Sequence, residues 1–143
     1  MNGLCIAYVR LKQSEQGVSF CSKADTYVAL SEGYFHLNQY QEAAASAQKA
    51  IELSPNSSPG YAGLGFILYQ MKKPKEAKKV FERALALAPN STSARYNLAM
   101  TCLALKQKDC AREQYAILKT VDSGLSTQLL DQIYSSKVVR LLR

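Results

Sequence analysis

The strongest constraint on the fold is an internal repeat: when the chain is aligned with itself at a shift of 34 residues, apolar and small residues fall in the same columns three times. The alignment does not drift along the chain. The columns, read from the first copy to the third, are Tyr27, Tyr61 and Arg95; Leu30, Leu64 and Leu98; Ser31, Gly65 and Ala99; Tyr34, Leu68 and Cys102; Ala43, Ala77 and Ala111; Ala47, Phe81 and Tyr115; and Ala50, Ala84 and Leu118. A period of this length indicates an array of stacked supersecondary units.

Each copy contains two stretches of apolar residues at helical spacing, separated by a polar break. In the first copy these are Tyr27, Leu30 and Tyr34, then Ala43, Ala47 and Ala50, with the break at Asn38 and Gln39. Pro55 and Pro89 end the first two copies, because proline lacks the amide donor and disfavours a helical conformation in the residue before it. Each copy is therefore expected to be a helical hairpin, and its small-residue columns allow the two helices to approach closely.

This pattern resembles the tetratricopeptide repeat, in which a large residue is followed by Leu-Gly, then Tyr, then Ala, an aromatic and Ala, with Pro at the end. Tyr27 and Tyr61 stand where the family has Trp, whereas Arg95 departs from the pattern and Asp122 replaces the third proline. The resemblance implies an all-α, right-handed superhelical solenoid of antiparallel helix hairpins in a single domain, residues 1–143. The three motifs are placed at 24–57, 58–91 and 92–124.

The ends of such an array need caps, because a terminal hairpin leaves one apolar face uncovered. Gly124 is expected to stop a helix, and a capping helix with a basic tail is predicted over 125–143. The tail, Lys137 to Arg143, extends that helix, pairs elsewhere or stays loose. The apolar stripe of the cap is formed by Leu125, Leu129, Leu130, Ile133 and Tyr134.

The N-terminal segment, residues 1–23, is about eight residues short of a normal repeat, since Tyr8 precedes Tyr34 by only 26 residues. A degenerate, shortened hairpin that partly covers the first repeat is favoured. The alternative is that the chain is a piece of a longer array that begins in the middle of a repeat.

The first helices of the hairpins are expected to line a concave groove. Residues that point away from the packing columns include Asp25, Ala29, His36, Gly63 and Ser93. Large side chains among such residues favour binding of a partner peptide or helix with apolar or aromatic anchors, unless they pack against the adjoining repeat or the terminal helices. The predicted partner-binding residues are Val28, Glu32, Phe35, Phe66, Tyr69, Tyr96, Asn97 and Met100.

One well-known ligand of the family that this sequence resembles is the C-terminal carboxylate of heat-shock chaperones. In those family members, a clamp of cationic residues and asparagines binds the carboxylate. The matching positions here are Val28, Glu32, Gly63, Ser93 and Asn97. None is a cation, and Glu32 would repel a carboxylate. The chaperone-clamp function is therefore not expected.

The net charge of +7 is concentrated in one run, on the second helix of the second repeat and the turn before it. Such a run is most often a solvated helix face, although it offers a convex surface for an acidic protein, an anionic membrane or nucleic acid. Nucleic acid is disfavoured because no aromatic residues are interleaved for base stacking. The basic-face residues are Lys72, Lys73, Lys75, Lys78, Lys79 and Arg83.

Catalysis, cofactors and metals have little support in the sequence. It lacks a Gly-rich phosphate loop and the common hydrolase and zinc-protease motifs, and its single histidine, His36, has no nucleophile partner. Its four cysteines, Cys5, Cys21, Cys102 and Cys110, lack C-x-x-C spacing and are expected to be free thiols in a reducing compartment, which favours the cytoplasm. No apolar stretch is long enough for a transmembrane helix, and no targeting signal is visible.

The sequence thus predicts a non-catalytic protein-interaction scaffold with no cofactor and no small-molecule substrate. Two alternatives stay open. One is a structural module that self-associates by stacking its end hairpins. The other is electrostatic binding of an acidic partner through the basic face.

Overall fold

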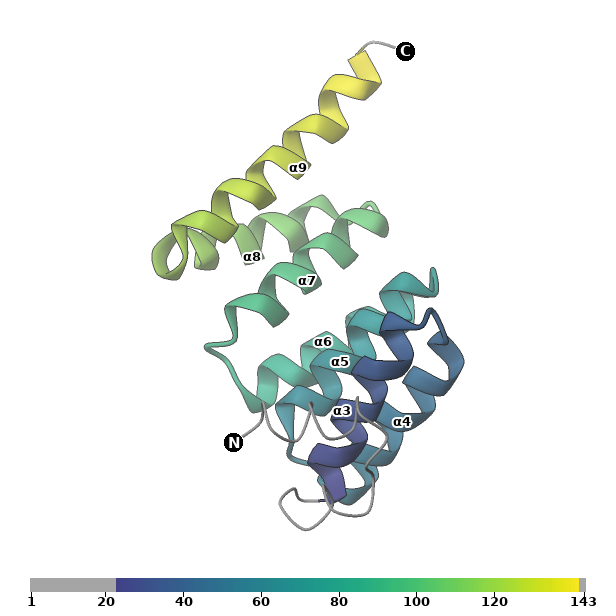
Figure 1. Ribbon diagram of the computed structural model, residues 1–143. Coiled ribbons are helices and arrows are strands. Elements are labelled where there is room, and N and C mark those ends of the chain that lie inside the picture. The colour runs from purple at the N-terminus through teal and green to yellow at the C-terminus, as the bar shows by residue number, and fades with distance from the viewer. Residues whose placement is uncertain (1–22, 142–143) are drawn as a thin grey trace.

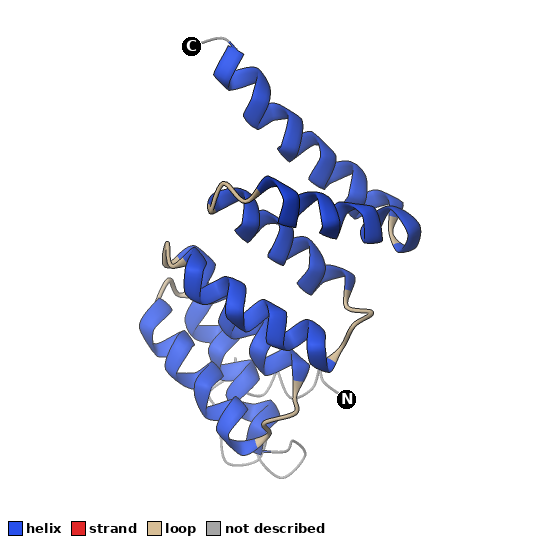
Figure 2. Ribbon diagram, turned by 180° about the vertical axis from the view of Figure 1, so that it is seen from behind, coloured by secondary structure: helices blue, strands red, loops and turns tan. Residues whose placement is uncertain are grey.

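The computed structural model describes the backbone of residues 23–141 and the side chains of residues 23–135. In this part of the chain seven α-helices follow one another and no strand occurs (Figures 1 and 2). The helices are α3 (Lys23–His36), α4 (Tyr40–Leu53), α5 (Ser58–Gln70), α6 (Pro74–Leu87), α7 (Thr92–Ala104), α8 (Lys108–Val121) and α9 (Ser123–Leu141). The predicted hairpin over residues 1–23 lies outside the described residues, apart from Lys23.

The helices pack as consecutive antiparallel pairs, α3 with α4, α5 with α6, and α7 with α8. Each pair also contacts the next, and among the first helices α3 contacts α5 and α5 contacts α7. Figure 1 shows the pairs rising from the N-terminal to the C-terminal end, with α9 laid across the last pair. The predicted all-α solenoid of helix hairpins is confirmed.

Each hairpin turns at a residue in the left-handed backbone region: Asn38, Lys72 and Lys106 have φ of 59°, 61° and 61°. The amide of the next residue donates back to a carbonyl near the end of the first helix, from Gln39 to Tyr34 and from Lys73 to Leu68 at 2.9 Å, and from Gln107 to Cys102 at 2.8 Å. This is the Schellman arrangement, which satisfies carbonyls at a helix end. The turn therefore repeats with the period of the sequence.

The small-residue columns bring the two helices of each hairpin together, as predicted. Gly65 shows how close the contact is, since a Cβ atom built on it would lie 2.9 Å from the ring of Phe81, a residue with no exposed surface. The members of the two columns, all buried, are Ser31, Gly65 and Ala99 on the first helices and Ala43, Ala77 and Ala111 on the second. One core continues from α4 to α8 through these contacts.

The C-terminal cap begins earlier than the sequence predicted. Gly124 was expected to stop a helix, but it lies in the first turn of α9. The break falls at Asp122, whose side-chain oxygen accepts a 2.9 Å hydrogen bond from the amide of Leu125, an N-cap contact that fixes the start of α9. Asp122 is equivalent to Ser54 and Ala88, the residues that end α4 and α6, and Ser123 rather than Asp122 takes the place of the prolines that follow them.

Helix α9 covers the end of the core, and Leu129 is fully buried against Ala99 and Leu118. Leu125 and Ile133 pack beside them, whereas Tyr134 is 55% exposed. The helix continues to Leu141, so the first residues of the basic tail extend it.

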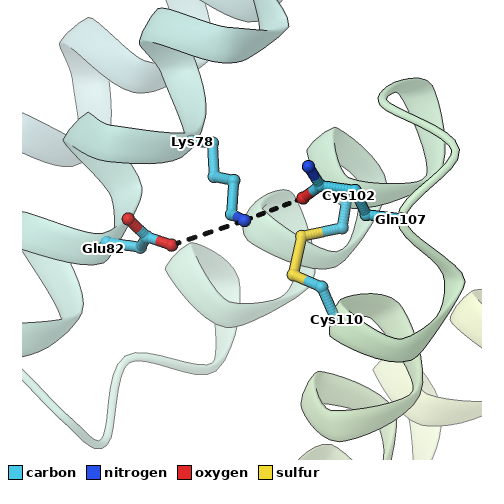
Figure 3. Close-up of polar contacts among 5 residues, drawn as sticks. All are labelled: Lys78, Glu82, Cys102, Gln107 and Cys110. Carbon is cyan, nitrogen blue, oxygen red and sulfur yellow. Dashed lines mark hydrogen bonds and ion pairs between the residues drawn. A yellow bond between two sulfur atoms is a disulfide. The ribbon is translucent and has the colours of Figure 1, made fainter.

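The expectation of free thiols is wrong for two of the four cysteines. Cys102 on α7 and Cys110 on α8 form a disulfide with a Cα–Cα distance of 5.9 Å (Figure 3). Sequence spacing did not indicate the pair because the two cysteines stand eight positions apart in the chain, and only the tight turn brings them together. Disulfides persist mainly in oxidising compartments, so the thiol argument for the cytoplasm loses its basis.

Within residues 23–141, no helix combines the length and the hydropathy needed to cross a membrane.

Candidate functional site

Two adjoining cavities lie between α3 and α5, with volumes of about 470 Å³ and 380 Å³. They share three lining residues, Ser31, Glu32 and Gly63, and thus form one groove along the two first helices. The larger cavity is also lined by Val28, Ala47, Ser58, Pro59, Gly60, Ala62, Ala88, Ser91 and Ser93, and the smaller one by Phe35, His36, Phe66 and Ile67. We call this space the α3–α5 groove.

The apolar wall of the groove is built on Phe35 and Phe66, whose ring centroids are 5.1 Å apart at a tilt of 54°. Phe35 also contacts Tyr40, at 5.5 Å between ring centroids. Both phenylalanines are only partly buried and pack on the core cluster. Aromatic rings at this separation and tilt attract each other, so the wall is preformed.

Glu32 stands where the two cavities meet and is exposed. It takes part in none of the ion pairs found among the described residues, and neither cavity is lined by Lys or Arg. His36 lies one turn further along α3. The groove therefore combines apolar walls with a carboxylate.

Gly63 leaves a bare backbone in the groove. A Cβ atom built at this position would meet nothing within 4 Å, in contrast to Gly65 two residues later. The absence of a side chain lets a ligand approach the helix backbone closely.

The rim near the starts of α5 and α7 carries three serines, Ser58, Ser91 and Ser93. Ser91 caps α7 by accepting a 3.3 Å hydrogen bond from the amide of Ala94, and the Ser58 hydroxyl donates to the carbonyl of Ala84 at 3.1 Å. Ser58 and Ser91 were missed by the sequence analysis, which considered only helix faces. The Asn-Ser after Pro89, at the turn into the next hairpin, was the signal available for Ser91, and Ser58 follows the equivalent Asn-Ser after Pro55.

The family follows from a comparison of the sequence with family models. The model described as Tetratricopeptide repeat matches residues 34–84 and 68–122, which together cover more than half of the chain. The chain belongs to the tetratricopeptide-repeat (TPR) family. No curated protein matches it in sequence.

Solved structures agree with this fold. The first TPR domain of RPAP3 (Spaghetti), bound to the HSP90 peptide SRMEEVD, has a TM-score of 0.74 and 21% identity, covering 81% of this chain and 94% of that one. MamA has a TM-score of 0.74 and 22% identity, with coverages of 95% and 78%. The type III secretion translocator chaperone SycD of Yersinia enterocolitica has a TM-score of 0.71 and 15% identity, with coverages of 82% and 96%. At these identities the likeness shows the fold alone.

The TPR array brings four of the eight predicted partner-binding residues together: Val28, Glu32, Phe35 and Phe66 line the α3–α5 groove. The other four lie outside its lining. Tyr69 packs on the main core cluster, Tyr96 and Met100 pack on the cluster under α9, and Asn97 is partly buried on α7. Ala29, counted as a groove residue from the sequence, is instead buried at 5% exposure.

The basic face lies on α6 and the turn before it, but three of its six side chains have local contacts. Lys73 Nζ lies 3.8 Å from a carboxylate oxygen of Glu76. Lys78 Nζ donates to Gln107 Oε1 at 2.7 Å and lies 3.8 Å from Glu82, so it links the second repeat to the third (Figure 3). The guanidinium of Arg83 lies 5.9 Å from the ring centroid of Tyr61. Lys72, Lys73, Lys75 and Lys79 are exposed.

No group of three or more His, Cys, Asp or Glu residues among those described is placed to hold a metal ion.

Proposed function

We propose that the chain is a protein-interaction scaffold that binds a peptide segment of a partner protein in the α3–α5 groove. The observation that carries this proposal is the groove itself, with two joined cavities and a preformed wall of Phe35 and Phe66. A concave space with apolar walls and a few polar groups is the usual form of a binding site. TPR proteins are generally interaction modules rather than enzymes, which agrees with this function.

Structural neighbours support a peptide as the ligand class. The first and second TPR domains of RPAP3 are both bound to the HSP90 peptide SRMEEVD. That peptide carries several carboxylates, and the groove proposed here presents Glu32 and no lysine or arginine. We therefore expect a peptide partner of different chemistry.

Filling the groove tests the proposal without removing any existing contact. Gly63→Leu places a side chain in the open space and suits a helix interior. Ala86→Leu adds the same side chain on the exposed surface of α6 and serves as the control. In a pull-down from lysate of the source cells, partners captured by the wild type and by Ala86→Leu should be lost from Gly63→Leu. Equal capture by all three proteins would exclude the groove.

Self-association is a second candidate, because large apolar side chains are exposed on the last two helices. Ile117, Val121 and Tyr134 are 42%, 62% and 55% exposed. An open-ended solenoid can stack through such a surface. Substituting Val121 and Tyr134 by Ser should then change the sedimentation of the purified protein, whereas Gly63→Leu should not.

The basic face is the third candidate surface, with four exposed lysines. Binding of an acidic partner to it should weaken steeply between low and physiological salt. Groove binding that depends mainly on apolar contacts should change far less, so a salt series distinguishes the two surfaces.

A further inference from the structure

We propose that the α3–α5 groove selects an extended partner segment in which a lysine or arginine stands two residues from a large apolar side chain. The inference rests on the proposed function, because it specifies the occupant of the same groove. Three features of the groove carry it: the charge of its lining, the spacing along α3, and the bare backbone at Gly63.

The charge of the lining selects a cation. Glu32 lines both cavities, is exposed, and forms none of the ion pairs found in the described part of the chain. A partner cation that pairs with this carboxylate gains the attraction between the two charges, which is strongest at low salt. A partner carboxylate at the same place would be repelled.

The spacing along α3 sets the distance between cation and anchor. Glu32 and Phe35 are three residues apart on one helix, which puts their Cβ atoms about 5–6 Å from each other. Phe66 pairs with Phe35 from α5 and widens the apolar wall. In an extended segment, side chains on the same face recur every two residues, at roughly 6.5–7 Å. A cation at one position and an apolar residue two positions on therefore match Glu32 and the phenylalanine pair.

The extended form of the partner follows from Gly63. Nothing lies within 4 Å of the point where its Cβ atom would be, and Gly63 lines both cavities together with Ser31 and Glu32. A narrow peptide backbone can approach the α5 backbone at this place, whereas a helix, about 10–12 Å across with its side chains, needs a wider trough.

The test uses the full chain and fluorescein-labelled nonapeptides with a Gly-Ser background and a variable centre. The centres are Arg-Ser-Phe, Glu-Ser-Phe and Arg-Ser-Ala, and binding is measured by fluorescence anisotropy at low salt. The Arg-Ser-Phe peptide should bind at least tenfold more tightly than either of the others. Glu32→Lys should reverse the order of the Arg and Glu peptides. Glu42→Lys, which makes the same charge change at an exposed position of α4, should leave the order unchanged.

The outcomes separate the two levels of the proposal. If Gly63→Leu binds every peptide as the wild type does, the proposed groove function fails. If Gly63→Leu abolishes binding but the wild type binds the Arg and Glu peptides equally, only the charge selection is overturned. If the wild type does not bind the Arg-Ser-Phe peptide at millimolar concentration, the charge selection is overturned as well. A concentration-dependent dimer of the protein alone that Glu32→Lys abolishes would assign the groove to a second copy instead.

Discussion

Two glycines of α5, two residues apart, have opposite surroundings. Gly65 faces Phe81 across the hairpin, and a Cβ atom there would lie 2.9 Å from the ring. Gly63 faces open space in the groove. The first glycine is required by packing, while the second is available to a ligand.

Substituting each glycine by alanine should therefore change stability in opposite directions. Gly65→Ala forces the buried Phe81 ring to move, and overpacking of this kind costs about 1–3 kcal/mol. Gly63→Ala relieves the entropic cost of glycine in a helix, a gain of up to about 1 kcal/mol. Urea unfolding followed by circular dichroism measures both changes, and equal shifts for the two variants would contradict the assigned packing.

The hairpin turns make a second prediction at this scale, because lysine tolerates the left-handed conformation less well than glycine or asparagine. Lys72→Gly should raise the free energy of unfolding by roughly 1 kcal/mol, since a side chain with a Cβ atom is penalised at φ of 61°. Lys79→Gly, at an exposed position in the middle of α6, should lower it by about 1 kcal/mol and provides the control. A stability loss from Lys72→Gly would show that the turn does not adopt this conformation.

At the scale of elements, the third hairpin has two ties that the other two lack among the residues that the structure describes. The Cys102–Cys110 disulfide joins α7 to α8, and Lys78 of α6 donates to Gln107 in the turn between them. Figure 3 shows both ties at the same turn. The disulfide therefore stabilises the third hairpin, and the Lys78 hydrogen bond joins this hairpin to the second repeat.

Reduction of the disulfide should loosen this hairpin selectively. A bridge that closes a short loop contributes roughly 2–3 kcal/mol in the chain-entropy view. Hydrogen exchange in the presence of a reducing agent should accelerate at the amides of α7 and α8 and stay unchanged in α3 and α4. Uniform protection before and after reduction would mean that the bridge adds nothing to the hairpin.

Some features of the elements could be predicted from the sequence, and others could not. Column residues such as Gly65 and Phe81 repeat along the chain, and their spacing predicted the hairpins correctly. The start of α9 depends on a side-chain cap at Asp122, and the disulfide depends on the turn at Lys106, so neither followed from periodicity. Local hydrogen bonds and turn geometry decided these features.

The candidate site was predictable only in part, because the face that a residue presents depends on its neighbours in space. Phe35 and Phe66 occupy equivalent faces of α3 and α5 and meet as expected. Tyr96 and Met100 lie on the corresponding face of α7, but α9 packs there. Both side chains therefore pack against the cluster of Ala99, Leu118 and Leu129. A capping helix thus changes the role of a face that the repeat alone would leave open.

At the scale of the whole molecule, three surfaces are candidate binding sites. The α3–α5 groove belongs to the first two described hairpins, the basic face to the turn before α6 and α6 itself, and the exposed apolar side chains to α8 and α9. The groove and the basic face share the second described hairpin, α5 with α6, whereas α8 and α9 lie at the C-terminal end of the stack (Figures 1 and 2). A single partner need not cover more than one of them.

Site-specific photo-crosslinking tests the central claim most directly. A photoreactive phenylalanine analogue replaces Phe66 in the groove, Lys79 on the basic face or Tyr134 on α9, one position at a time, and the protein is irradiated in lysate of the source cells. If the partner binds in the groove, the analogue at position 66 should give a distinct crosslinked adduct. This adduct should disappear when Gly63→Leu is added to the same protein. The analogues at positions 79 and 134 should give no adduct of the same mass. Adducts from position 79 or 134 alone would contradict the account and move the binding surface to the basic face or the C-terminal end.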